Sequence, residues 1–274
     1  LMSCSARLPV YILITAACIP ERQILGGWVS QQALVLLSMY LLGIVVAICV
    51  AWTLKKTMLK GKTPVFVMEL PSFKMPRISI VSRKMFQQGM DFVKQAGTLI
   101  LACTVLIWAL AYFPRSEPAV EQLSATQTSG IQLRTSYLGR AGQAIEPVVR
   151  PLGWDWKIGI AVLASFPARE VVVGTMGVIY NLGDEEDEAS AGLRDHLINA
   201  TWDDDPSKPV FTVPVGLSIM VFFALCAQCV STLAVLKKET RSWRWPLFTF
   251  VYMTVLAYVA AWVTFVVASN CLSV

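Results

Sequence analysis

The sequence contains little charge for its length. Only 15% of its 274 residues are Asp, Glu, Lys or Arg, whereas 55% are hydrophobic and the mean hydropathy is +0.59. A soluble domain carries about 25% charged residues. Several apolar runs reach the ~20 residues that a helix needs to cross a ~30 Å hydrocarbon core. The composition therefore excludes an ordinary soluble domain and indicates an integral membrane protein.

Histidine and nucleotide-binding motifs are scarce or missing. His196 is the single histidine, which excludes a multi-histidine metal site within this sequence. No segment matches the phosphate-binding pattern G-x-x-x-x-G-K-[ST], and no catalytic motif is present, so we expect no nucleotide or other cofactor to bind here. The net charge of +5 is spread over loops, without a basic stripe interleaved with aromatics, which argues against nucleic acid as a partner.

Disulfide bonds are not expected, although seven cysteines are present. Buried free cysteines behave as small apolar residues. Six of the seven lie in apolar stretches: Cys4, Cys18, Cys49, Cys103, Cys226 and Cys229.

Apolar blocks divide the chain. They cover residues 8–19, 32–54, 97–113, 158–180, 213–236 and 247–268. The sequence opens at Leu1, already inside an apolar segment, and we expect it to be the C-terminal piece of a longer protein.

The connections between blocks differ in charge. Residues 55–94 hold nine bases against two acids, and residues 237–246 hold four bases against one acid, so both are expected in the cytoplasm. Residues 181–212 carry nine acids and two bases and are expected outside. These three locations are compatible with one another only if block 158–180 enters and leaves the membrane on the same side, and does not span it as a single crossing. The C-terminus is then expected outside.

Block 158–180 contains features that interrupt a helix. Pro167 removes a backbone hydrogen bond in its middle, and the charges of Arg169 and Glu170 are costly at bilayer depth unless they face protein or water. We therefore expect a broken or re-entrant element. The predicted fold class is an all-α polytopic membrane helix bundle with about five spanning helices, this broken element and an interfacial amphipathic helix at 138–157.

The predicted organisation has three parts. Residues 1–54 end a first membrane repeat, residues 55–94 form the basic cytoplasmic loop, and residues 95–274 form a second membrane repeat. Within the second repeat, exposed loops are expected at 114–157 and 181–212.

A cysteine recurs in similar surroundings at the two ends of the chain. SCSARLPV at 3–10 and QCVSTLAV at 228–235 align without a gap, which superposes Cys4 on Cys229. The predicted topology gives the two segments opposite directions, as in the inverted repeats of transporters, which bind their substrates where such repeats meet. Thiolates suit soft or borderline metals, and Glu170 would add a carboxylate ligand. Packing is the alternative role for both cysteines.

Other polar residues near these segments have two possible roles each. Arg7 and Arg169 are candidate ion-pair partners of Glu170. Cys226 lies three residues before Cys229 and is a candidate auxiliary ligand or a packing residue. The hydroxyls of Ser5, Ser231 and Thr232 either bond across helices, at ~0.6 kcal/mol each, or contribute metal ligands.

Several segments together resemble one known family. LMSCSARLPVYIL, TPVFVMELPSFKMPR, KQAGTLILACTVLIWAL, GRAGQAIEPVVRPLGWDWKIGIAVLASFPAREVVVGTMG and QCVSTLAVLKKETRSWRWPLFTFVY are similar, in this order, to the bacterial ferrous iron transport protein B family. The similar part is the second half of that family's membrane domain, with its second Gate, or nucleoside-recognition, region. Where relatives often have proline before the second cysteine, this chain has Gln228, so a helix break there is not assured.

The resemblance implies Fe(II) as the transported ion, the bacterial inner membrane as the location, and Cys4 and Cys229 as the transport cysteines. It also implies partners outside this sequence: an N-terminal G domain that binds GTP and Mg²⁺, a first Gate repeat, small cytoplasmic iron-transport accessory proteins, and membrane lipid.

Two other functions stay open from the residues alone. A nucleoside-type solute carrier would use the same inverted-repeat logic, with aromatic and amide groups at its site. A membrane thiol oxidoreductase would use Cys226 and Cys229 as a redox pair, although the βα context of thioredoxin-like motifs is missing.

Overall fold

The computed structural model describes most of the predicted apolar segments. The described residues are 7–20, 23–24, 29–58, 75, 77–114, 135–166, 169, 171–179, 197–198, 200–202, 207–227 and 230–272. Almost all of their regular structure is helical, as expected. A two-residue antiparallel hairpin, β1 (Gln23–Ile24) with β2 (Val29–Ser30), joins the first two helices.

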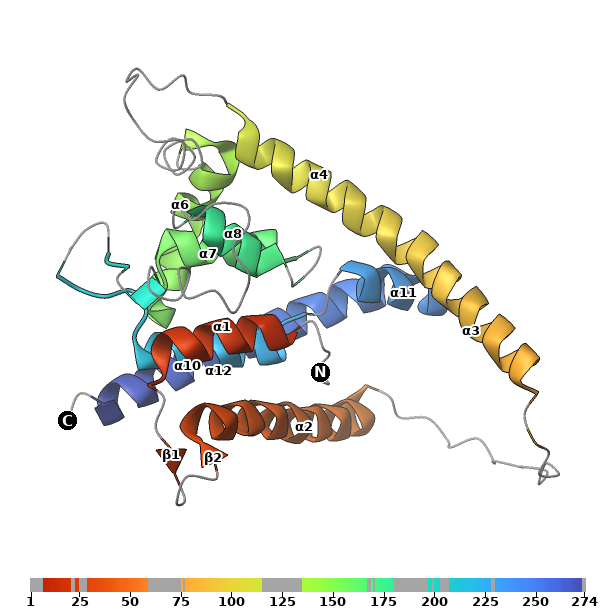
Figure 1. Ribbon diagram of the computed structural model, residues 1–274, viewed down its shortest axis with the longest axis horizontal. Coiled ribbons are helices and arrows are strands. Elements are labelled where there is room, and N and C mark those ends of the chain that lie inside the picture. The colour runs from red at the N-terminus through yellow and green to blue at the C-terminus, as the bar shows by residue number, and fades with distance from the viewer. Residues whose placement is uncertain are drawn as a thin grey trace.

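Three helices form a central layer. They are α1 (Leu8–Cys18), α10 (Val213–Leu225) and α12 (Arg244–Leu272), and α10 packs against both of the others (Figure 1). All of α10 from Ser218 to Leu225 is buried. The core of the protein is therefore centred on a helix of only 13 residues.

The helices α1 and α10 approach closely because one of them carries glycine at the crossing. A Cβ atom added at Gly216 would lie 2.7 Å from Cys18 Sγ and 3.3 Å from Ile14 Cγ2. Further along, the Thr15 hydroxyl donates a 3.4 Å hydrogen bond to Met220 Sδ. Since Cys18 meets Gly216 and Thr15 meets Met220, the two helices run antiparallel.

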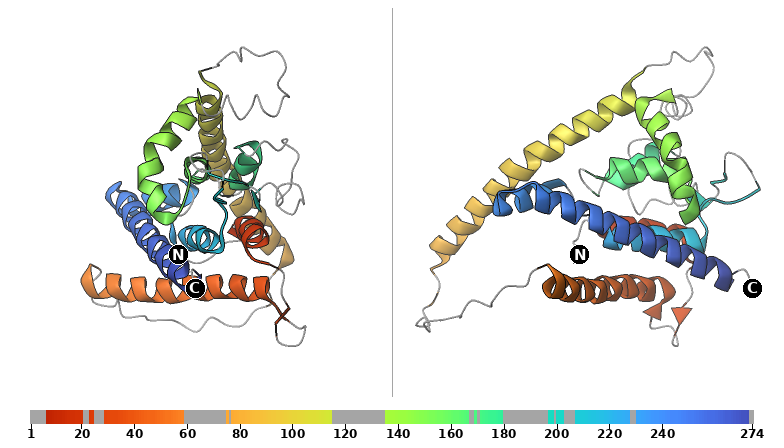
Figure 2. Two further views of the ribbon diagram at one scale, coloured as in Figure 1. Left: turned by 90° about the vertical axis from the view of Figure 1, so that its left-hand side faces the viewer. Right: turned by 180° about the vertical axis from the view of Figure 1, so that it is seen from behind.

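A second group of helices lies on the other side of α10 from α2 (Gln31–Thr57) (Figures 1 and 2). It consists of α6 (Tyr137–Val149), the 3₁₀ turn η3 (Arg150–Leu152), α7 (Trp156–Ala164) and α8 (Val171–Ile179). Asp155 caps α7 by accepting a 2.8 Å hydrogen bond from the Ile158 amide. Gly142 of α6 packs directly on Ile160 of α7. The buried face of α6 is thus covered by α7, and its predicted position at the membrane interface stays a prediction.

Gly153 fixes the turn between η3 and α7, at a place where α12 packs closely. Its φ of +78° lies in the left-handed region, which only glycine adopts without strain. A Cβ atom there would also meet the ring of Phe265 in α12. The turn is therefore specified by both backbone conformation and space.

Two helices are long and apolar enough to cross a membrane, among the residues the structure describes: α2 (Gln31–Thr57) and α12. Ser30 caps α2, and Lys55 and Lys56 occupy its last turn. Most of the side chains along α2 are exposed, and its large exposed apolar residues include Leu34, Leu37, Leu41, Ile44, Val45, Ile48 and Trp52. An apolar helix with so little covered surface fits a lipid environment. The predicted number of about five spans stays a prediction.

A long continuous helix leads away from the central layer. It comprises α3 (Ile78–Phe92), the π-helical turn η2 (Val93–Gly97) and α4 (Thr98–Tyr112) (Figure 1). The predicted apolar block at 97–113 is therefore the second part of a helix that begins inside the predicted basic loop.

One apolar block is not a continuous helix. In block 213–236, α10 ends at Leu225 and α11 (Val230–Thr240) begins five residues later. The helix is interrupted at the segment that contains Cys226. The predicted interruption of block 158–180 is also present, as the separation of α7 from α8.

Candidate functional site: two interrupted helices joined by an arginine

The end of α10 leaves backbone carbonyls without helical partners. Cys226 has extended backbone dihedrals, with φ −61° and ψ 160°, and its amide makes the last helical bond, 2.7 Å long, to the Phe222 carbonyl. The last four carbonyls of any helix lack intrahelical donors. Inside an apolar protein such carbonyls must find other donors.

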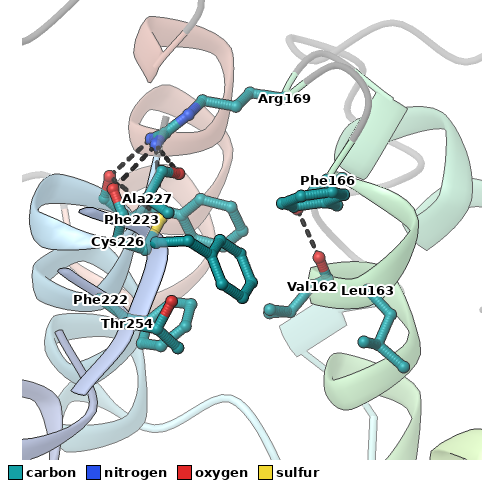
Figure 3. A pocket seen from close by; sticks show the side chains of 11 residues that line it. Val162, Leu163, Phe166, Arg169, Phe222, Phe223, Cys226, Ala227 and Thr254 are labelled. Atoms are coloured by element: carbon teal, nitrogen blue, oxygen red, sulfur yellow. Dashed lines mark hydrogen bonds between the residues drawn. The ribbon is translucent and has the colours of Figure 1, made fainter. Parts of the chain in front are cut away.

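Arg169 supplies these donors from the other interruption. Nη1 donates a 2.7 Å hydrogen bond to the Phe223 carbonyl. Nη2 donates to the carbonyl oxygens of Cys226 at 3.2 Å and Ala227 at 2.8 Å. The same nitrogen lies 3.4 Å from Cys226 Sγ (Figure 3).

The position of Arg169 is determined by the chain around it. α7 ends at Ala164, where the Ser165 hydroxyl donates a 2.6 Å bond back to the Val162 carbonyl. The Arg169 carbonyl then accepts a 3.2 Å bond from the Val172 amide, at the start of α8. The side chain is only 6% exposed. The guanidinium therefore connects the 165–170 interruption to the α10–α11 interruption.

The electrostatics of this contact are favourable although the charge is buried. Its partners among the described residues are neutral, but they are the negative end of the α10 dipole, which stabilises a cation by up to ~2 kcal/mol in partly buried geometries. Each hydrogen bond to a charged group adds about 1.5–3 kcal/mol. Removing one member of such a buried contact lowers the free energy of unfolding more than removing both members. The reason is that the remaining polar groups then have neither water nor protein as a partner.

A second arginine and a tyrosine lie close to the same cysteine. Arg7, at the N-terminal end of α1, is fully buried, and both Arg7 and Arg169 are within electrostatic range of the Cys226 side chain. Tyr11, one turn further along α1, is also fully buried and within range of both arginines and of Cys226. Its hydroxyl has no hydrogen-bond partner among the described residues.

A cavity of about 330 Å³ adjoins the arginine contact. Its walls come from α7, from the end of α10 and from α12, and are mostly apolar (Figure 3). The polar groups among the lining residues belong to Ser165, Arg169, Cys226 and Thr254. The cavity and the hydrogen-bonded carbonyls thus share the Arg169 and Cys226 side chains.

The structure describes some of the predicted site residues. Arg169 contacts Cys226 at the end of α10, Arg7 is buried within electrostatic range of Cys226, and Thr232 is exposed on α11. Ser231 belongs to α11, but its side chain lies outside the described residues. Five predicted residues also lie outside the described part of the chain: Cys4, Ser5, Pro167, Glu170 and Cys229. Whether an arginine pairs with Glu170, and whether Cys4 and Cys229 face one another, stay predictions.

The described residues contain no group of three or more acidic, histidine or cysteine side chains placed to hold a metal ion. The oxygen atoms gathered at the end of α10 are backbone carbonyls, and the sequence alone does not indicate which residues supply them.

Comparison with known proteins places the sequence in a family. Residues 36–88 match the family model described as "Ferrous iron transport protein B C terminus", and residues 93–243 match the Gate model, described as "Nucleoside recognition". The second match alone covers more than half of the chain. No solved structure matches the chain.

Curated relatives extend the match to almost the whole chain. The protein named "Fe(2+) transporter FeoB" of Leptospira interrogans is 41% identical over 266 residues, which is 97% of this chain and 37% of that protein. The proteins of the same name from Leptospira biflexa and Campylobacter jejuni are 43% and 32% identical, over 97% and 96% of this chain and 37% and 39% of their own lengths. The chain thus spans a little over a third of the length of these relatives. It belongs to the ferrous iron transport protein B family, and carries that family's C-terminal and Gate regions.

Proposed function

We propose that this chain forms part of the membrane pathway through which Fe(II) crosses the inner membrane of a bacterium. The names of its relatives support iron as the transported ion. The length and apolar surface of α2 and α12 support a location in the membrane.

The contact between two interrupted helices is the observation that carries the proposal. Transporters commonly bind ions where unwound backbone and half-helix ends expose carbonyl groups near the middle of the membrane. Here the α7–α8 and α10–α11 interruptions meet through Arg169, beside the cavity. An ion pathway requires polar groups inside an apolar bundle, and this is where the described residues gather them.

Cys4 and Cys229 are the proposed transport ligands, with Glu170 as a third. The antiparallel pairing of α1 with α10 supports this assignment. In this pairing Arg7 and the end of α10 are at the same end of the helix pair, and Cys4 and Cys229 are close to these two ends in the sequence. Thiolate and carboxylate ligands together suit Fe(II), which is a borderline metal.

The complete protein would contain further parts. We expect a cytoplasmic G domain that binds GTP and Mg²⁺ and gates the pathway, a first Gate repeat, and cytoplasmic accessory proteins. A relative of Porphyromonas gingivalis, 34% identical over 97% of this chain, is named as a fusion of Fe(2+) transport protein A with the transporter, which supports a small accessory partner.

Transport by cysteine variants tests the proposal. Cys4→Ser and Cys229→Ser, made in the full-length protein that contains this chain, should each lower Fe(II) uptake by cells without lowering the amount of folded protein. Cys49→Ser is the matched control, because Cys49 is exposed on α2 and belongs to neither of the two similar cysteine segments.

The two alternative functions make different predictions. A nucleoside carrier would need amide groups at its site, but no described residue that lines the cavity between α7, α10 and α12 has a side-chain amide. A thiol oxidoreductase would lose all activity with Cys226→Ala. Iron uptake at saturating Fe(II) should largely survive that change.

A further inference from the structure

The Arg169 guanidinium occupies a position suited to a free cation. Four acceptor atoms surround its two terminal nitrogens: the carbonyl oxygens of Phe223, Cys226 and Ala227, and Cys226 Sγ, at 2.7–3.4 Å. None of these acceptors carries a formal charge in the thiol form of Cys226. The arrangement binds positive charge without neutralising it.

We infer that these atoms form a divalent-cation subsite, which Arg169 fills while the pathway is closed. When the guanidinium withdraws, three carbonyl oxygens and the Cys226 sulfur remain directed toward the vacated volume. The inference rests on the proposed function only for the identity of the ion as Fe(II). The binding site itself is defined by the α10 terminus.

The donor set determines the class of ion. Carbonyl oxygens alone suit hard cations, whereas a thiolate selects soft or borderline metals such as Fe(II), Zn(II) and Cd(II). Coordination by sulfur releases the Cys226 proton to water, so that one negative charge accompanies the incoming divalent ion. The α10 dipole adds to the attraction, because its negative end is at this site.

Two further observations point to a ligand at this position. The Tyr11 hydroxyl is fully buried and has no hydrogen-bond partner among the described residues, and it lies within electrostatic range of Cys226 and Arg169. A buried hydroxyl without a partner is costly, and an ion or its bound water would supply one. The adjoining cavity of about 330 Å³ gives the arginine side chain room to move without unpacking α10.

Arg169 is therefore a positioning residue with two effects on transport. Its hydrogen bonds keep the carbonyls oriented when no ion is present, and its charge competes with the ion for the same atoms. Competition of this kind makes binding reversible, because the arginine returns when the ion leaves.

Cd(II) binding to the purified full-length protein tests the inference without relying on transport. The readouts are the number of bound ions at fixed free Cd(II) and the thiolate-to-metal absorption band. Arg169→Gln should bind one more Cd(II) per chain than the wild type, with a stronger band. Arg140→Gln, which removes an exposed arginine of α6, should match the wild type.

The double variant Arg169→Gln/Cys226→Ala assigns the extra ion. It should return to the wild-type number of bound Cd(II) ions. If Arg169→Gln binds no extra ion, or if the double variant keeps it, the inference is wrong. Loss of Fe(II) uptake in the cysteine variants is a separate measurement, so the proposed function and this subsite can fail independently.

A second variant, Cys226→Ser, keeps Arg169 and tests the inference if Arg169→Gln does not fold. Cys226→Ser should raise the Cd(II) concentration that half-inhibits Fe(II) uptake by about tenfold, the lower end of the range for a perturbed metal site, and should leave inhibition by Mn(II) unchanged. Unchanged inhibition by Cd(II) would show that Cys226 contributes no ligand and would overturn the inference.

Discussion

Arg169 and Phe223 are 54 residues apart in sequence, yet the guanidinium of one donates a 2.7 Å hydrogen bond to the carbonyl of the other. This bond joins the end of α10 to the interruption between α7 and α8. Both interruptions therefore depend on one side chain, and changes at that side chain should affect stability as well as transport.

Replacing Arg169 by alanine should destabilise the protein. The change leaves the carbonyls of Phe223, Cys226 and Ala227 without their donor, and a buried acceptor left without a donor costs about 1–3 kcal/mol. Thermal unfolding of the purified protein in detergent measures the loss. Arg140→Ala, an exposed control, should change the free energy of unfolding by less than about 0.5 kcal/mol.

Arg169→Lys should recover only part of this loss. Lysine keeps the charge at the α10 terminus but places it on a single nitrogen, whereas Arg169 uses two nitrogens in a planar fork. A lysine variant as stable as the wild type would show that charge alone, and not the forked geometry, holds the interruption.

The α1–α10 contact should be intolerant of a single methyl group. Gly216→Ala places a Cβ atom 2.7 Å from Cys18 Sγ and 2.8 Å from Cys18 Cβ, which forces the helices apart. Overpacking of this kind costs about 1–3 kcal/mol. Unfolding in detergent should show the loss.

Gly89→Ala is the matched control for this change. Gly89 lies in α3, and no atom is within 4 Å of the position that its Cβ would occupy. Alanine is up to about 1 kcal/mol better than glycine in a helix. Gly89→Ala should therefore be neutral or stabilising, and equal destabilisation by both variants would refute the packing explanation.

Membrane topology supplies an independent prediction. The basic residues after α2 and at the end of α11 are expected in the cytoplasm, and the end of α12 is expected outside. A reporter that works only in the cytoplasm should be inactive when fused after residue 274 and active when inserted in 59–74. Activity at the C-terminus would require block 158–180 to cross the membrane once.

Helix positions were the most predictable part of the fold. The block at 8–19 corresponds to α1, the block at 32–54 to α2, and the block at 247–268 to α12, each within a few residues. Hydropathy succeeds here because each segment is a continuous apolar run. In 158–180 the proline and the charges also marked the interruption correctly.

The interruption after Leu225 was not predictable in the same way. Gln228 stands where proline would have signalled a break, and the flanking residues are apolar, so block 213–236 has the composition of one helix. The carbonyls exposed by the break are stabilised by Arg169, which is distant in sequence. A local pattern contains no information about such a partner.

The candidate site was only partly predictable for the same reason. Side chains suited to metals, such as Cys226, are visible in the sequence, and the arginines are conspicuous in apolar surroundings. The carbonyl groups of Phe223 and Ala227 cannot be recognised in the sequence, because every residue has a carbonyl and only the fold decides which carbonyls lack helical donors. The same holds for the Tyr11 hydroxyl: its lack of a hydrogen-bond partner among the described residues is visible only in the fold.

Fe(II) uptake by cells that express the full-length protein tests the central claim most directly. Wild type, Cys4→Ser, Cys229→Ser and Cys49→Ser should be compared at equal amounts of membrane-inserted protein. The account predicts that the first two serine variants take up much less Fe(II) than the wild type, while Cys49→Ser matches it. Wild-type uptake by both Cys4→Ser and Cys229→Ser would contradict the proposed pathway.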